Sequence, residues 1–172
     1  LTDLRTCYDV TFYDLFIIID EQDKSIKSSY NIIYFTAQND FLKLQIDLAN
    51  NMSIHKIEFE DNDLFFEREF DAVHIVFPRK INSNEKHAIK VYYEGFPKEA
   101  INPPWDGGFS WDKDSKGNPW ISVSCQGLGA SVWWPCKDHQ SDEPDSMRIT
   151  CVARSPLKII SNGNLRHEKK YW

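Results

Sequence analysis

The sequence has no long run of apolar residues and no excess of positive charge. No apolar stretch approaches the ~18–20 residues that a membrane-crossing helix needs. The first residues, LTDLRTCYDV, lack the charged, apolar and small-residue regions of a signal peptide. Twenty Lys and Arg residues face 26 Asp and Glu, a formal net charge of -6. Without a basic stripe, nucleic acid and anionic membranes are poor partners. We expect a soluble protein, either cytoplasmic or exported after removal of a leader.

Cysteines are too few and too scattered to predict a disulfide scaffold. The four are Cys7, Cys125, Cys136 and Cys151. The spacing of the last three also misses the close C-x-x-C pairs of structural zinc sites. We expect buried thiols of the kind common in protein cores, with a single disulfide as the alternative.

Several motifs of catalytic and metal sites are missing as well. None of the five histidines has another at i+4, and the segment from His167 places Tyr171 where H-E-x-x-H needs its second histidine. Ser131 lacks the second glycine of a G-x-S-x-G elbow. The stretch 112–123 begins like a calcium loop, but Lys116 and Val123 stand where oxygen ligands are required. The sequence therefore predicts no metal site and no serine nucleophile in this chain.

Two weaker catalytic alternatives involve residues 125–145. One pairs Cys125 or Cys136 with His139 as a thiolate and its base, which requires an electropositive setting that the sequence does not show. The other uses two acids among residues 142–145 on a glycosidic bond. Acids in loops are usually solvated, so neither alternative is favoured.

The apolar periodicity is that of strands. Residues 8–19, YDVTFYDLFIII, begin with alternation and are rich in β-branched and aromatic side chains. Similar patterns, mostly separated by turn residues, occupy residues 30–35, 42–48, 54–59, 72–77, 88–93, 120–123, 147–152 and 158–161. No segment keeps a helical repeat over three turns, so any helix is short. The sequence predicts one all-β domain over residues 1–172, either a sandwich or a strongly curved sheet.

Aromatic residues concentrate in the middle of the chain, where five of the six tryptophans lie between Pro97 and Pro144. The stretch GGFSWDKDSKGNPWISV, residues 107–123, predicts a hairpin whose turn is DKDSKGN. Its rings are expected either to pack in the core and across strands or to form an apolar surface that another body covers.

Several short motifs also follow one another in a fixed order. They are NPPWDGGF at 102–109, GNPW at 117–120, SCQGLGA at 124–130, WPCKD at 134–138, DEPD at 142–145 and SNG at 161–163. In this order they resemble the N-terminal domain of the M1 (gluzincin) family of zinc aminopeptidases. The resemblance extends back to YDV at 8–10 and YEG at 93–95, so it spans nearly the whole chain.

This resemblance implies a saddle-shaped domain of curved, mainly antiparallel sheets that packs beside a thermolysin-like catalytic domain and helps wall its substrate cavity. The family's G-x-M-E-N loop and H-E-x-x-H zinc helix lie in that catalytic domain and are absent from this sequence. We therefore expect no catalytic residue, metal ligand or cofactor here. Zinc belongs to a longer parent enzyme, and the partners are its catalytic domain and the N-terminus of a peptide substrate. The last residues, 170–172, resemble an interrupted strand, which favours a piece of a longer enzyme.

The resemblance also assigns a substrate-binding residue. Gln126 stands nine residues before Pro135, where the family has a Gln or Glu that binds the free α-amino group of the substrate. Its amide oxygen is a suitable acceptor for an ammonium group, and Ser124 and Gly127 are its neighbours in the predicted site. The family further implies a cis peptide bond between Gln126 and Gly127. The alternative for Gln126 is a polar side chain satisfied within its own loop.

The neighbouring loop residues are predicted to be structural: Pro135, Cys136, Asp138, Asp142, Glu143 and Asp145. The proline fixes the backbone, Cys136 packs inside, and Asp138 binds backbone N–H groups of the turn. The three acids of the DEPD motif are expected to cap or brace the loop against the catalytic domain.

Two alternatives come from other functional classes. Exposed Trp and Tyr side chains on a β-sandwich also suit a carbohydrate-binding or adhesion module, and a stand-alone protein-interaction domain is the third possibility. The reading frame beyond Trp172 distinguishes them, because G-x-M-E-N followed by H-E-x-x-H favours the peptidase.

Overall fold

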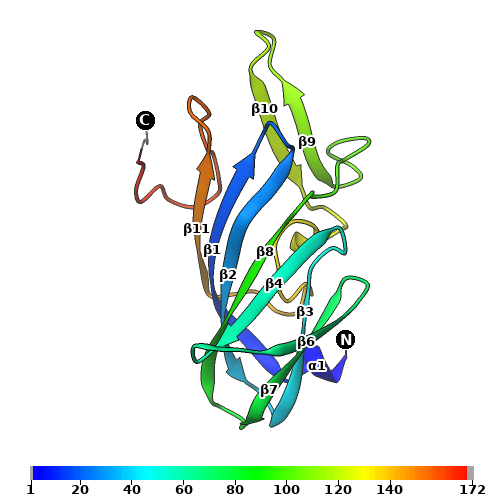
Figure 1. Cartoon of the computed structure of the whole chain (residues 1–172), viewed down its shortest axis with the longest axis vertical. Helices are drawn as coiled ribbons and strands as arrows, with labels where there is room; N and C mark the ends of the chain where they lie inside the picture. The colour runs from blue at the N-terminus through cyan, green and yellow to red at the C-terminus, as the bar shows by residue number, and fades with distance from the viewer. Residues whose placement is uncertain (1, 170–172) are drawn as a thin grey trace.

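The computed structural model describes residues 2–169, and nearly all of its regular structure is β-strand (Figure 1). The strands are β1 (Tyr8–Asp20), β2 (Ser25–Ala37), β3 (Phe41–Asp47), β4 (Met52–Phe59), β5 (Asn62–Asp63), β6 (Phe65–Glu69), β7 (Ala72–Ile81), β8 (Lys86–Gly95), β9 (Gly108–Lys113), β10 (Pro119–Ser124) and β11 (Ser146–Ala153). The described helical elements are α1 (Asp3–Thr6) and a 3-10 turn, η1 (Ala130–Val132). No helix in this part of the chain has the length and apolar character needed to span a membrane.

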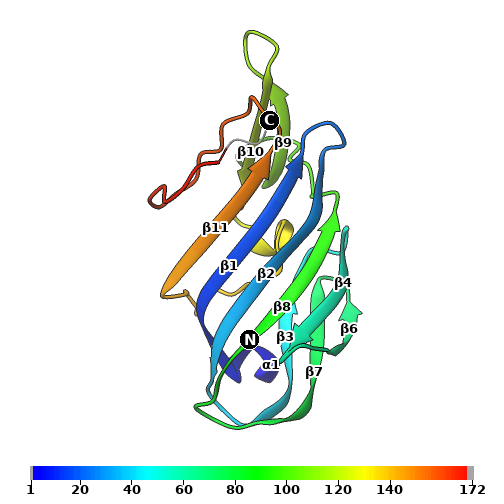
Figure 2. The same cartoon turned by 60° about the vertical axis from the view of Figure 1, so that its left-hand side comes forward.

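The strands form three sheets. The largest has the order β11-β1-β2-β8-β4-β5, the second has the order β3-β7-β6, and β9 and β10 form a separate hairpin. Figure 2 shows the strands of the large sheet side by side, with the hairpin at one end of the molecule. Among the named strands of the described residues, all pairings are antiparallel except that of β1 with β11. The predicted all-β fold with mainly antiparallel sheets is confirmed.

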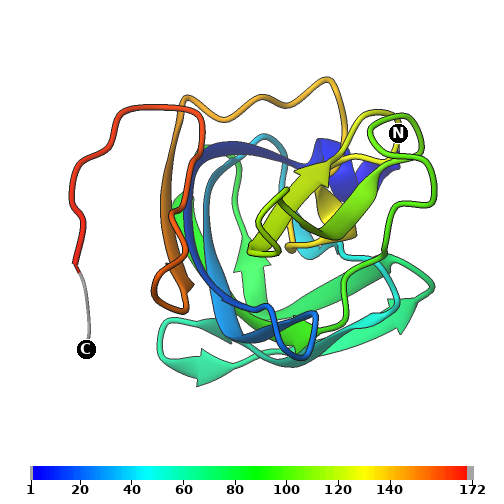
Figure 3. The same cartoon turned by 90° about the horizontal axis from the view of Figure 1, so that it is seen from above.

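One contiguous hydrophobic core lies inside the curved sheets, which Figure 3 shows from above. Alternation along β1 points Tyr13, Leu15 and Ile17 into this core, and each is at most 4% exposed. Leu44 of β3 and Ile75 of β7 enter it from the second sheet. Burying such side chains contributes roughly 1.5–3 kcal/mol each, so packing between the sheets is the main source of stability.

One predicted strand is absent from the structure, and the observed strand β6 was not predicted. The strand predicted at 158–161 is wrong, because no neighbouring strand covers this segment and Ile160 is 92% exposed. The strand β6 was missed because its sequence, FFERE, begins with two adjacent aromatic residues and shows no clean alternation. The strand expected at 170–172 lies outside the described residues.

Candidate functional site

Gln126 lies at the tip of a tight turn that follows β10. The turn is closed by two backbone hydrogen bonds, from the N–H groups of Leu128 and Gly129 to the carbonyl oxygen of Cys125, at 3.2 and 2.9 Å. Gln126 is exposed, and its side chain makes no hydrogen bond to any described residue. Its amide is therefore available to a ligand rather than consumed within the loop.

The predicted cis bond after Gln126 is absent. Within residues 2–169 the cis bonds are Pro103–Pro104 and Ser155–Pro156, so Gln126–Gly127 is trans. Gly127 is exposed, and no atom of the described chain lies within 4 Å of the position its Cβ would occupy. A non-proline cis bond costs ~2.5–4 kcal/mol, and the open space beside Gly127 offers no packing there to offset it.

Ser124 faces away from the tip of the turn. Its hydroxyl donates a 2.8 Å hydrogen bond to the carbonyl oxygen of Pro104, which joins the end of β10 to the NPPWDGGF loop. The serine thus fixes the base of the turn, whereas Gln126 remains the polar group at its tip.

Asp138 holds the other side of the turn. Its carboxylate accepts a 3.0 Å hydrogen bond from the N–H of Ser131. A Cβ on Gly129 would lie only 2.1 and 2.2 Å from the two carboxylate oxygens of Asp138. Gly129 also has a φ of +81°, a conformation that L side chains rarely adopt. Position 129 therefore requires glycine on both grounds.

Asp138 is in turn attached to a buried acid from β3 that the sequence did not reveal. The backbone N–H of Asp138 donates to Asp47 Oδ2 at 3.1 Å, and Arg5 binds the same carboxylate through Nε, at 3.1 Å, and through its terminal nitrogen. Asp47 is 4% exposed. Its backbone also exchanges hydrogen bonds of 2.7 and 3.1 Å with Cys136. Arg5 and Asp47 lie 42 residues apart, so no local pattern links them.

A hollow of about 560 Å³ lies beside the turn. Cys125, Gly127 and Leu128 line it on one side, and Arg5 and Asp71 line it on another. Gln126 itself is not among the lining residues. The hollow mixes apolar surface with opposite charges, so it is open to a ligand that combines an apolar group with a polar one.

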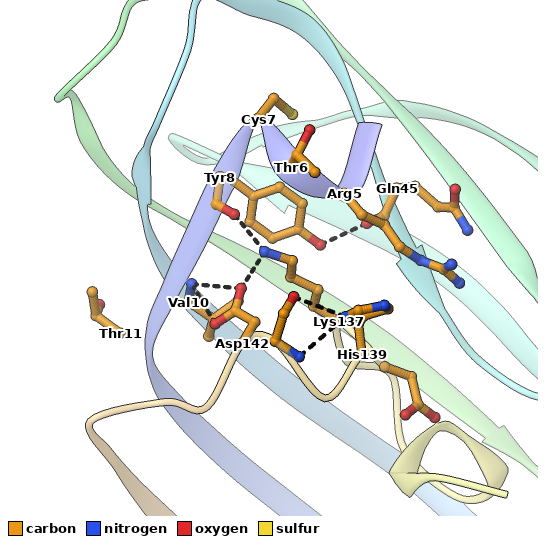
Figure 4. Close-up of polar contacts among 12 residues, drawn as sticks. Arg5, Thr6, Cys7, Tyr8, Val10, Thr11, Gln45, Lys137, His139 and Asp142 are labelled. Carbon is orange, nitrogen blue, oxygen red and sulfur yellow. Dashed lines mark hydrogen bonds and ion pairs between the residues drawn. The ribbon is translucent and has the colours of Figure 1, made fainter. Parts of the chain in front are cut away.

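The DEPD loop is held against β1 by a buried ion pair. Figure 4 shows the Lys137 ammonium between the Tyr8 carbonyl and the Asp142 carboxylate. The N–H of Val10 also donates to both oxygens of Asp142 at 3.3 Å. Asp142, predicted to cap or brace the loop, binds the Val10 N–H and Lys137 within its own domain. Glu143 and Asp145 remain exposed.

Pro135 and Cys136 are buried, as a structural role requires. The thiols of Cys125 and Cys136 are poor nucleophiles. All four cysteines are free. Burial raises the pKa of the Cys136 thiol well above its usual range, and burial likewise raises that of Cys125. Because the thiolate is the reactive form, the structure does not support a Cys–His nucleophile at this loop.

The described residues offer no metal site. Between residues 2 and 169, no three His, Cys, Asp or Glu side chains come together in a way that could hold an ion. In the turn that resembles a calcium loop, Asp114 Oδ1 accepts hydrogen bonds of 2.8 Å from the N–H groups of Lys116 and Asn118. The zinc implied by the family resemblance therefore does not fit these residues.

The predicted hairpin is confirmed as β9 and β10, and its aromatic residues fall into two groups. Phe109 is 2% exposed and stacks on Trp111 with ring centres 5.1 Å apart. Trp120 on β10 and Trp105 on the loop before β9 are 61% and 80% exposed. Some of the rings therefore form core, as one interpretation expected, while others form exposed apolar surface.

Comparison with known proteins gives a likeness in fold but none in sequence. No family model matches the chain, and no curated protein does. Among solved structures, the fold is similar to a mutant M1 zinc metallopeptidase from Deinococcus radiodurans bound to a Tyr-Ser-Ala substrate. That match has a TM-score of 0.66 at 21% identity and covers 84% of this chain and 32% of the other.

A second similar structure is leukotriene A4 hydrolase from Saccharomyces cerevisiae. Here the TM-score is 0.66 at 13% identity, with coverage of 90% of this chain and 24% of the other. A metallopeptidase described as having two domains, bound to L-tryptophan, matches over 33% of its length. The chain thus spans a third or less of each of these proteins, and it resembles the M1 zinc metallopeptidases in fold.

Proposed function

We propose that residues 1–172 form the N-terminal domain of a longer zinc-dependent M1 aminopeptidase, which removes N-terminal residues from peptides. The ordered motifs of the sequence support this, as does the similarity in fold to M1 zinc metallopeptidases over 84–90% of the chain. The small fraction of those proteins that the chain spans is consistent with a separate catalytic domain. Zinc and the hydrolytic residues then belong to that domain, which is the intramolecular partner.

Within the parent enzyme, Gln126 binds the α-ammonium group of the peptide substrate. The observation that supports this best is an exposed amide, without a hydrogen-bond partner among residues 2–169, at the tip of a closed turn. The amide oxygen accepts a hydrogen bond from the ammonium, and a substrate without that group leaves the amide unpaired. A neutral amide attracts the cation less strongly than a carboxylate would.

The turn around Gln126 also forms part of the wall of the substrate cavity. Leu128 is 39% exposed beside the hollow and provides apolar surface there. The exposed rings of Trp105 and Trp120 and the exposed acids Glu143 and Asp145 are candidates for contact with the catalytic domain. Burial of such aromatic residues is typical of the cores of interfaces.

The test uses the enzyme encoded by the complete reading frame. Gln126→Ala should raise KM for an aminoacyl-4-nitroanilide roughly tenfold, the effect of one hydrogen bond to a charged group, while Gln126→Glu should retain or improve binding. Gln38→Ala, at an exposed position outside the hollow, is the matched control and should leave KM unchanged. Unaltered kinetics for Gln126→Ala would exclude this role.

The exposure of Trp105 and Trp120 favours one alternative, a carbohydrate-binding module, because flat exposed rings stack on sugars. In that case the chain alone should bind oligosaccharides in calorimetry, and the double substitution Trp105→Ala and Trp120→Ala should abolish the heat. A reading frame that continues into G-x-M-E-N and H-E-x-x-H would decide for the peptidase.

A further inference from the structure

We infer that Asp138 is a positioning residue for Gln126 and that the Arg5–Asp47 ion pair holds Asp138 in place. This inference rests on the proposed role of Gln126 in substrate binding. It assigns to the N-terminal helix and to the end of β3 a part in setting the geometry of the substrate-binding turn.

The Ser124 hydroxyl holds the base of the turn, and Asp138 holds the point where the chain leaves it. Its two hydrogen bonds converge on one acceptor, the carbonyl oxygen of Cys125, and Gly127 makes no close packing contact on the side where a Cβ would point. At the other end of the turn, the Asp138 carboxylate lies against the Cα of Gly129 and accepts the N–H of Ser131. This contact fixes the point from which the chain leaves the turn.

Asp138 is itself placed by Asp47. The 3.1 Å hydrogen bond from the Asp138 N–H to Asp47 Oδ2 fixes its backbone. The carboxylate of Asp47 also accepts both bonds from Arg5 and a 2.9 Å bond from Gln45 Nε2. A guanidinium group presents a rigid fork that matches a carboxylate, so Arg5 fixes the position of the Asp47 side chain.

The charges explain why Arg5 is needed. Asp47 and Asp138 bring two acidic groups close to the same hollow, where both are lining residues together with Arg5. Arg5 supplies the positive charge that directly contacts the more buried acid. Without it, a nearly buried carboxylate would lose its compensating partner, and the attachment of Asp138 to β3 would weaken.

Small displacements at this turn have large consequences in the proposed function. A misplacement of about 1 Å in a substrate-positioning group can cost about a hundredfold in rate. Asp138 contacts the end of the turn at Gly129 and Ser131, so the inference requires its effect on the substrate to pass through Gln126.

The kinetic test is a double-mutant cycle in the full-length enzyme. Asp138→Ala should lower kcat/KM about tenfold when Gln126 is present and less than about twofold in the Gln126→Ala background. Asp138→Asn, which keeps an acceptor oxygen for the Ser131 N–H, should retain most of the activity. Equal losses in both backgrounds would overturn the inference. If Gln126→Ala alone left kcat/KM unchanged, that result would instead contradict the proposed function on which the inference rests.

A second test uses the 172-residue chain and needs no substrate. Asp138→Ala and Arg5→Ala should each raise the hydrogen-exchange rates of the Leu128 and Gly129 amides about tenfold or more, because these amides close the turn. The Val91 amide in β8 serves as an internal control and should keep its protection. Unchanged exchange at Leu128 and Gly129 in folded protein would overturn the inference, whatever the kinetics of the parent.

Discussion

Lys137 and Asp142 form an ion pair in which the two side chains are only 5% and 3% exposed. The ammonium group also donates to the Tyr8 carbonyl oxygen and lies 4.6 Å from the centre of the Tyr8 ring. The backbone N–H of Lys137 donates to the Tyr13 hydroxyl at 3.0 Å. This pair therefore attaches the loop before β11 to β1.

Removing one partner of the Lys137–Asp142 ion pair should destabilise the folded protein. Asp142→Ala leaves a buried ammonium group without its counter-charge, and we expect a loss of about 3–5 kcal/mol in the free energy of unfolding. Urea denaturation of the chain measures this change. Asp145→Ala, in the same loop but exposed, should stay within about 0.5 kcal/mol of the wild type. Replacing both partners with Lys137→Met and Asp142→Leu should cost less than Asp142→Ala, and a larger loss would contradict this view of the pair.

Two glycines of the same turn should respond differently to alanine. Gly127→Ala meets no neighbouring atom within 4 Å and suffers only from its φ of +80°, a cost of about 1–2 kcal/mol. Gly129→Ala has the same kind of strain and also collides with the Asp138 carboxylate. Its loss of stability in urea should be clearly larger. Equal losses would show that Asp138 moves aside without cost.

Glu85 should make stability depend on acid pH. Hydrogen bonds from His87, followed by Asn82 and Arg79, lower the pKa of Glu85 from 4.5 to about 2. Because the pKa is lower in the folded state, these contacts stabilise the protein above pH 4.5. That contribution decreases as the pH falls toward about 2.

Melting temperatures across this pH range test the prediction. Glu85→Gln should melt below the wild type at neutral pH, and the difference should shrink with acidification until it vanishes near pH 2. Glu69→Gln is the matched control, because Glu69 is exposed and has no side-chain hydrogen bond or ion pair within residues 2–169. A constant difference between wild type and Glu85→Gln at every pH would contradict the assignment.

The cysteines should react slowly in the folded protein. Burial raises the pKa of Cys7 and of Cys151 to about 11, and that of Cys136 is raised as well. Few thiolates therefore exist near pH 8, and alkylation by iodoacetamide should be much slower in buffer than in urea. Mass spectrometry of timed samples counts the modified thiols. Native and unfolded chains that react at the same rate would disprove this protection.

The 172-residue chain alone should not hydrolyse an aminoacyl-4-nitroanilide, with or without added zinc. The proposed function places the metal and the catalytic groups in another domain, so only the longer enzyme should be active. Absorbance of the released nitroaniline measures turnover. Zinc-dependent hydrolysis by the pure chain itself would refute this division of roles.

Local pattern predicted most strands but not where they begin. The second strand was predicted at residues 30–35, whereas β2 already begins at Ser25, directly after a turn in which Lys24 takes a φ of +53°. The polar residues Lys27, Ser28 and Ser29 hid the start of this strand. The hairpin of β9 and β10 was predicted fully because its turn residues and aromatic arms agree.

The candidate site was only partly accessible from sequence. The ordered motifs located Gln126, but the residues that hold its turn come from distant segments. Arg5 pairs with Asp47 across 42 residues, and Lys137 contacts Tyr8 across 129. Lys137 also stands in a stretch of charged side chains that normally indicates solvent. Its burial arises because the loop packs against β1 at Tyr8 and Tyr13, and no local rule predicts that contact.

The parallel pairing of β1 with β11 affects how the chain folds during synthesis. Phe12 lies opposite Ser146 and Ile19 lies opposite Ala153, so β1 acquires its outer neighbour only from residues 146–153. Until the ribosome has released β11, this margin of the nascent sheet stays unpaired. Long-range contacts of this kind slow folding. The large sheet therefore cannot be completed before residues 146–153 have left the ribosome.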